Sequence, residues 1–172
     1  SAISPVPISA TMPWGSQHVG FLVNATAGMQ PVIDRVQAAW AQNAWANCPT
    51  CSTDTLHLVP FRDTAVHLGS TTNPEQFGNW LGTLEASGGG TCADATFDAL
   101  RTFGRNLDSD NAAVSDAIVF SDSVPAGNRR AFGYLLNQLI ARDIQVHNVG
   151  PTLCSDGNLP DSAMSYLSLL SG

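Results

Sequence analysis

The chain has 172 residues, which suits one domain with a full core, and 44% of them are hydrophobic. Its formal net charge is −7, and all seven basic residues are arginines. An acidic chain without basic clusters is a poor candidate for binding nucleic acid or an anionic membrane surface. The apolar runs are also shorter than the roughly 18–20 residues of a membrane span. These numbers favour a single globular domain and exclude nucleic acid and membrane insertion.

The first quarter of the chain predicts an arm, a strand and a helix. Residues 1–16 contain three prolines, which favour extended backbone, so we expect an arm or linker there. Gln17 to Val23 ends in an apolar run and is typical of a buried central strand. Pro31 suits the first turn of a helix, and apolar side chains follow it at helical spacing. We expect this helix to end near Asn47.

The middle of the chain predicts two strands and two helices. Residues 55–61 alternate as a strand does, and residues 65–68 are expected to pair with them in a hairpin. Asn73, followed by proline and glutamate, is typical of a helix start. After the glycine run at 88–90, helical spacing resumes between Ala95 and Phe103.

The last third of the chain predicts a strand at 117–120, a helix at 130–142, a strand at 144–149 and a helix at 161–170. Strands that alternate with helices predict an α/β fold with a mostly parallel, doubly wound sheet. In such sheets, ligands lie beyond the carboxyl ends of the strands. The polar residues that follow the first and fourth strands, and the glycine run, are therefore the candidate site.

Three short segments carry a resemblance to a known family. They are Phe21-Leu22-Val23-Asn24-Ala25-Thr26-Ala27-Gly28, Gly88-Gly89-Gly90-Thr91-Cys92-Ala93-Asp94 and Val119-Phe120-Ser121-Asp122. In this order and spacing they resemble the three loops of a von Willebrand factor A (vWA) domain, in the hemicentin-like extracellular branch. The resemblance covers residues 17–172. It implies a doubly wound sheet with helices on both faces and one short antiparallel edge strand.

The resemblance also implies a metal-ion-dependent adhesion site. In that family, an Asp-x-Ser-x-Ser loop, a threonine of the glycine loop and an aspartate after the fourth strand hold Mg²⁺ or Mn²⁺. This oxygen shell leaves one position for an acidic group of the partner. The matching residues here are Asn24, Thr26, Gly28, Thr91 and Asp122.

Two of these positions depart from the family pattern. Asn24 replaces a carboxylate by a neutral amide, and Gly28 removes a hydroxyl, so the affinity for a hard dication should fall. Asp94, three residues after Thr91, is a carboxylate that could compensate if it reaches inward. Two interpretations stay open. In one, Asn24, Thr26, Thr91 and Asp122 weakly bind Mg²⁺, Mn²⁺ or Ca²⁺. In the other, these groups only satisfy the backbone at the strand ends.

Asn24-Ala25-Thr26 is also a glycosylation sequon. A glycan on Asn24 would cover the implied metal site. The end of a buried strand is a poor acceptor for a glycan, so this remains a lesser alternative.

The four cysteines form an even set, which permits disulfides and a secreted location, although four reduced thiols remain an alternative. The vWA-like arrangement would place Cys48 and Cys51 at the amino ends of the strands, and Cys92 and Cys154 at the opposite end. One zinc ion could not then reach all four thiols. Within the implied fold we predict the disulfides Cys48–Cys51 and Cys92–Cys154.

The sequence offers no convincing catalytic group. His18, His57, His67 and His147 each stand alone in strand-like runs and are predicted to be packed or edge histidines. No nucleophile elbow, phosphate-binding loop or dinucleotide-binding motif is present. Ser123, His147 and an aspartate could form a triad, but nothing in their spacing requires it. We therefore expect no enzyme activity.

The resemblance implies an extracellular module for protein–protein contact or assembly in a matrix, cell-surface or filament protein, with weak metal binding or none. Its partners would be proteins, including other chains of the same assembly. The first alternative is a metal-dependent adhesion domain that binds an acidic partner group, and the more distant one is a hydrolase-type enzyme. A full vWA domain also has one more edge strand and helix than this chain shows. We expect the arm or a neighbouring chain to cover the edge of the strand at 144–149.

Overall fold

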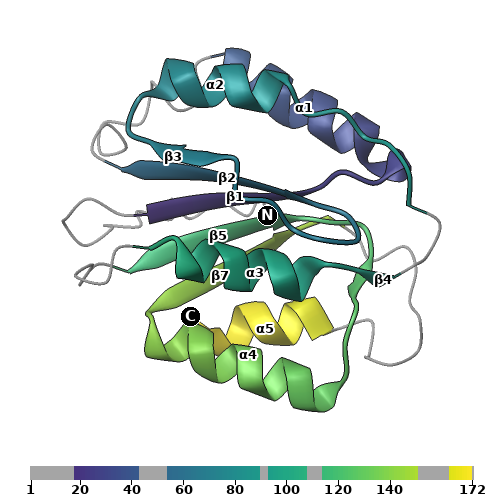
Figure 1. Cartoon of the computed structure of the whole chain (residues 1–172), viewed down its shortest axis with the longest axis vertical. Helices are drawn as coiled ribbons and strands as arrows, with labels where there is room; N and C mark the ends of the chain where they lie inside the picture. The colour runs from purple at the N-terminus through teal and green to yellow at the C-terminus, as the bar shows by residue number, and fades with distance from the viewer. Residues whose placement is uncertain (1–17, 43–53, 90–92, 108–113, 151–162, 172) are drawn as a thin grey trace, which may run out of the picture.

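A computed structural model describes residues 18–42, 54–89, 93–107, 114–150 and 163–171. It shows one α/β sheet with helices on both faces (Figure 1), which confirms the predicted fold class. The expected arm at 1–16 lies outside the described residues, as do the four cysteines and Thr91. No helix in the described part of the chain has the length and apolar character that a membrane crossing requires.

The central sheet has five strands in the order β3-β2-β1-β5-β7. Strand β1 pairs in parallel with β2 on one side and with β5 on the other, and β7 extends the sheet beyond β5. Only β3 runs antiparallel, against β2. The strands are β1 (His18–Asn24), β2 (Thr55–Phe61), β3 (Gly69–Thr71), β5 (Ser115–Phe120) and β7 (Ile144–Val149). All seven residues of β1 are buried, as expected for a central strand between two helical layers.

Two helices cover one face of the sheet and three cover the other (Figure 1). The first pair is α1 (Gln30–Ala41), which follows a short 3₁₀ turn η1 (Ala27–Met29), and α2 (Pro74–Gly82). The other three are α3 (Thr96–Arg105), α4 (Arg129–Ala141) and α5 (Ala163–Ser171). Two dipeptides, β4 (Ala93–Asp94) and β6 (Val124–Pro125), form a separate parallel pair that the sequence did not predict.

The sheet separates two apolar cores. Phe21, Ile33 and Phe77 belong to the core beneath α1 and α2. Leu22, Phe103 and Leu135 belong to the core beneath α3, α4 and α5. Adjacent residues of β1 therefore point into opposite cores, as strand geometry requires. Gly20 lets α3 approach β1 closely, because a Cβ atom there would lie 2.8 Å from the Phe103 ring.

The helix starts follow the sequence signals. Asn73 caps α2 by accepting hydrogen bonds from the backbone N–H groups of Glu75 and Gln76, and Pro74 occupies the first turn. Asn128 caps α4 in the same way. The first helix is shorter than expected within the described residues, since it ends at Ala41 and residues 43–53 lie outside them.

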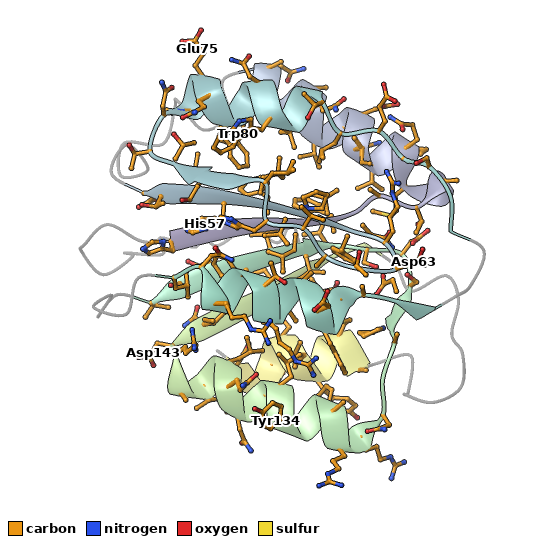
Figure 2. The ribbon with its side chains drawn as sticks, viewed as in Figure 1. His57, Asp63, Glu75, Trp80, Tyr134 and Asp143 are labelled. Carbon is orange, nitrogen blue, oxygen red and sulfur yellow. The ribbon has the colours of Figure 1, made fainter. Side chains whose placement is uncertain are left out.

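The pairing predicted for residues 65–68 is confirmed in part, because the backbone N–H groups of Val66 and Leu68 donate to the β2 carbonyls of Pro60 and Leu58. The antiparallel strand β3 begins only at Gly69, and Ala65 makes an isolated bridge with Phe61. Val66 and Leu68 are 54% and 44% exposed, so their apolar side chains lie at the surface rather than in the core. Trp80 of α2 points toward the sheet (Figure 2), and a Cβ atom at Gly69 of β3 would lie 2.7 Å from its indole ring.

Strand β7 forms one edge of the sheet, and α5 covers part of it. The Ser171 hydroxyl accepts a hydrogen bond from the Val146 N–H at 3.0 Å, and the Ser168 hydroxyl donates to the Val146 carbonyl at 2.5 Å. These are the backbone groups that a further strand would use. Among the described residues no strand pairs with this edge, so hydroxyl groups of the last helix satisfy part of it.

Candidate functional site

The loops that follow β1 and β2 and the described part of the glycine loop meet at the carboxyl end of the sheet. Ser87 donates its backbone N–H to the Ala25 carbonyl at 2.9 Å, and the Gly88 carbonyl accepts from Ala27 at 3.0 Å. Gly89 has a φ of 78°, and a Cβ atom there would lie 2.7 Å from the Thr26 side chain. Glycine is therefore needed at position 89 both for its backbone conformation and for this close approach.

Asn24, the last residue of β1, lies at the centre of a buried polar cluster. Its side chain is fully buried, and its amide nitrogen lies between four side-chain oxygens. The distances are 3.0 Å to Asp94, 3.2 Å to Ser123, 3.3 Å to Ser121 and 3.4 Å to Asp122. Its carbonyl oxygen instead accepts a hydrogen bond from the Thr26 backbone at 3.0 Å. A glycan on this nitrogen would require the amide to leave the cluster.

Asp94 reaches inward from β4 and joins the three loops. One carboxylate oxygen accepts from the hydroxyls of Ser121 and Ser123 at 2.6 and 2.7 Å, in addition to the Asn24 amide. The other accepts from the backbone N–H and the hydroxyl of Thr96 at the start of α3. Burial raises the pKa of Asp94, while these hydrogen bonds act in the opposite direction. The sequence suggested that Asp94 could reach the site, and the structure places it there.

Asp122 is the half-buried acidic residue of the cluster. One of its oxygens is 3.4 Å from the Asn24 amide nitrogen. The other would lie 3.2 Å from a Cβ atom at Gly28, so the missing side chain of Gly28 leaves a space beside this carboxylate. Thr26 lies nearby, half-buried, with its side chain against the glycine loop.

The donor set of this cluster does not fit a divalent cation in its present arrangement. Carboxylate and hydroxyl oxygens are the ligands that Mg²⁺, Mn²⁺ and Ca²⁺ prefer. Here, however, the hydrogens of the Asn24 amide point at those oxygens, and a cation among them would face the same N–H groups. Within the described ranges, no group of three or more His, Cys, Asp or Glu side chains is placed to hold a metal ion.

The sequence did not predict how Ser121, Ser123 and Thr96 contribute. The two serines stand out in the sequence as a Ser-Asp-Ser run directly after a buried strand. The carboxylate that accepts hydrogen bonds from their hydroxyls, Asp94, lies 27 residues or more away in the sequence. Of the predicted residues, Asn24, Asp94 and Asp122 come together, and Thr26 borders them.

A second polar group lies at the opposite end of the sheet, where three histidines form a row. His18 of β1 and His57 of β2 share a hydrogen bond of 2.7 Å, and His57 shares another of 3.0 Å with His67. Burial, with the neighbouring histidines, lowers the pKa of His57 from 6.5 to about 3, and burial also lowers the pKa of His67. Figure 2 shows His57 and Asp63 at opposite ends of the sheet. From the sequence, these histidines were predicted to be isolated, and their hydrogen-bonded row was not predicted.

Other candidate groups do not form a catalytic site. His147 of β7 pairs with Asp116 of β5 at 2.7 Å, whereas Ser123 belongs to the Asp94 cluster.

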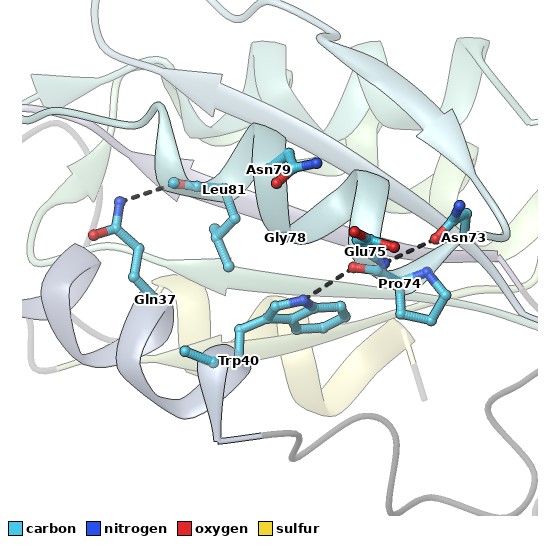
Figure 3. Close-up of a pocket in the computed structure, with 10 residues that line it drawn as sticks. Gln37, Trp40, Asn73, Pro74, Glu75, Gly78, Asn79 and Leu81 are labelled. Atoms are coloured by element: carbon cyan, nitrogen blue, oxygen red, sulfur yellow. Dashed lines mark hydrogen bonds between the residues drawn. The ribbon is translucent and has the colours of Figure 1, made fainter.

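A surface hollow of about 670 Å³ lies between α1 and α2 (Figure 3). Trp40 donates across it to the Pro74 carbonyl, and Gln37 donates to the Leu81 carbonyl. These bonds join the two helices.

Comparisons with known proteins identify the fold. No protein-family profile and no curated protein matches the chain. The crystal structure of the conserved hypothetical protein BatB from Bacteroides thetaiotaomicron is similar with a TM-score of 0.66 at 15% identity, over 91% of this chain and 87% of that one. The SpRpn10 VWA domain is similar with a TM-score of 0.66 at 10% identity, over 92% and 83%.

A third structure is similar over a comparable share of the chain. It is an aerotolerance-related membrane protein from Bacteroides fragilis NCTC 9343 that carries multiple mutations to serines. Its TM-score is 0.62 at 11% identity, over 91% of this chain and 88% of that one. At these identities the likeness is one of fold alone. The chain has a vWA-like α/β fold.

Proposed function

We propose that the chain is an extracellular module for protein–protein contact, which binds its partner through the loops at the carboxyl end of the sheet and holds no metal ion there. The observation that carries this proposal is the cluster around Asn24. Its buried groups satisfy one another, so the loops have a fixed shape without a cation. A preformed face loses less conformational entropy on binding than a mobile one.

The extracellular assignment, and membership of the hemicentin-like branch, rest on the sequence. The even number of cysteines favours an oxidising compartment, and the order of the three loop motifs resembles extracellular vWA domains. The partners are expected to be proteins of a matrix, cell surface or filament, including other copies of the same assembly.

A metal-dependent adhesion domain is the alternative function. Asp122 favours it, because its half-buried carboxylate at the loop surface is of the type that such a site uses. The direction of the Asn24 amide disfavours it. A hydrolase has less support still, because His147 pairs with Asp116 and Ser123 pairs with Asp94, in separate hydrogen-bonded groups.

Site-specific photo-crosslinking tests the proposed face. Ala27 is exposed beside the cluster, and Arg105 is exposed at the far end of α3. We expect benzoylphenylalanine in place of Ala27 to give defined protein adducts at the surface of the source cells, and the same group in place of Arg105 to give none. The adducts should persist in EDTA and decline when unlabelled protein is added in excess.

Two results would contradict the proposal. Equal adducts from both positions would mean that the carboxyl-end loops are not the binding face. Adducts that disappear in EDTA would instead support the metal-dependent alternative.

A further inference from the structure

The amide group of Asn24 has the surroundings of a small cation. Four oxygens from two separate segments, Asp94 and residues 121–123, converge on its nitrogen at 3.0–3.4 Å, and two of them belong to the carboxylates of Asp94 and Asp122. The nitrogen is fully buried. Its two hydrogens add positive partial charge to that of the Ser121 and Ser123 hydroxyl hydrogens, which are donated to the Asp94 carboxylate.

The carbonyl oxygen of the Asn24 side chain fixes the direction in which the amide nitrogen points. The Asn24 carbonyl oxygen accepts the Thr26 backbone N–H at 3.0 Å. Rotating the amide by half a turn would place its NH₂ group against that N–H, and its oxygen against the Asp94 carboxylate. Both contacts would be repulsive and would leave buried polar groups without partners. The positive end of the amide therefore has one favourable direction, toward the carboxylates.

We propose that the Asn24 amide takes the structural place of a divalent cation in this vWA-like site. It draws the loops after β1 and β5 and the Asp94 segment together, so that their arrangement needs no metal. This inference rests on the geometry of the cluster and not on the proposed protein-binding function. The crosslinking experiment therefore does not decide it, and it needs a separate test.

The proposal makes a specific statement about charge. Asn24→Asp replaces the NH₂ group by an oxygen and brings a third carboxylate beside Asp94 and Asp122. Three carboxylates in a buried cluster repel one another unless a proton or a cation joins them. Together with the hydroxyls of Ser121 and Ser123 they form the hard-oxygen set that binds Mg²⁺, Mn²⁺ or Ca²⁺. A single substitution should therefore make the stability of the domain dependent on metal.

Thermal unfolding of the full chain in EDTA, and in millimolar MnCl₂, MgCl₂ or CaCl₂, tests this at neutral pH. We expect Asn24→Asp to unfold at a lower temperature than the wild type in EDTA. A dication at about one hundred times its dissociation constant should raise that midpoint by about 5–10 °C. The matched control is the exchange Asn24→Asp with Asp94→Asn, which keeps one amide and one carboxylate at these positions. It should be more stable than Asn24→Asp in EDTA and gain less from metal.

Isothermal titration with Mn²⁺ provides a second readout. Asn24→Asp should bind about one ion per chain, and Gly28→Ser, which adds a hydroxyl but keeps the amide, should bind none. The proposal is overturned if Asn24→Asp is as stable as the wild type in EDTA and takes up no ion. It is also overturned if Asn24→Asp fails to fold both with and without metal, since a cation would then not replace the amide.

Discussion

Replacing Asp94 by alanine is expected to lower the free energy of unfolding by about 3–4 kcal/mol. The carboxylate is 3% exposed and accepts hydrogen bonds from Asn24, Ser121, Ser123 and Thr96. Without it, several buried donors lose their acceptor at once, and β4 loses its link to the start of α3. Urea unfolding at pH 7, followed by tryptophan fluorescence, measures this loss.

Two variants control this measurement. Asp94→Asn keeps the size of the side chain and one acceptor oxygen, so its loss should be about half as large. Asp63→Ala removes an exposed carboxylate just after β2 and should change stability by less than about 0.5 kcal/mol. If Asp94→Ala costs no more than Asp63→Ala, the buried cluster does not hold the loops together.

The stability of the domain is expected to fall by about 3 kcal/mol between pH 7 and pH 4 through His57 alone. Its pKa is lowered from 6.5 to about 3 in the folded state, so the unfolded chain binds the proton first as the pH falls. The contribution of the neutral imidazole is thus fully present above pH 6.5 and is lost progressively down to about pH 3. Urea unfolding at unit steps of pH measures the loss.

Because carboxylates also contribute to acid unfolding, the test is a difference between two proteins. His57→Gln replaces the imidazole by a neutral amide that does not titrate. This variant should be less stable than the wild type at pH 7, and the gap should narrow by about 3 kcal/mol at pH 4. Parallel stability curves for the two proteins would show that His57 does not carry this dependence.

The row of histidines also limits how many protons it can accept. Each of its two hydrogen bonds, between His18 and His57 and between His57 and His67, needs one proton between its nitrogens. Three neutral rings satisfy both bonds, and one added proton can be accepted without losing either. Two charged rings would place two protons in one of these bonds and break it. Acid should therefore act on the row cooperatively, by opening it at the second proton.

The architecture was accessible to sequence reasoning because local signals agreed with the fold. Asn73 with Pro74 marked the start of α2, and the apolar run before Asn24 marked a central strand. The sequence was less exact at the edge of the sheet. Residues 65–68 do hydrogen-bond to β2, but the regular strand β3 begins at Gly69, where Trp80 of α2 occupies the space that a side chain would need.

The two polar clusters show why site chemistry was harder to predict than the fold. Asn24 and Asp94 are 70 residues apart, so the sequence could suggest that Asp94 reaches inward but could not show which way the amide points. The histidine row depends on strand register, because His57 pairs with Gly20 while His18 pairs with Thr55. A shift of one residue would turn His57 to the other face of the sheet.

Thermal unfolding of the wild-type chain in EDTA and in Mg²⁺, Mn²⁺ or Ca²⁺, beside Asp122→Ala, tests most directly the claim that the loops need no cation. A ligand that binds only the native state must raise the unfolding midpoint. We predict the same midpoint for the wild type in EDTA and in each metal at millimolar concentration. A rise with Mg²⁺ or Mn²⁺ that disappears in Asp122→Ala would contradict the claim and restore the metal-dependent adhesion site.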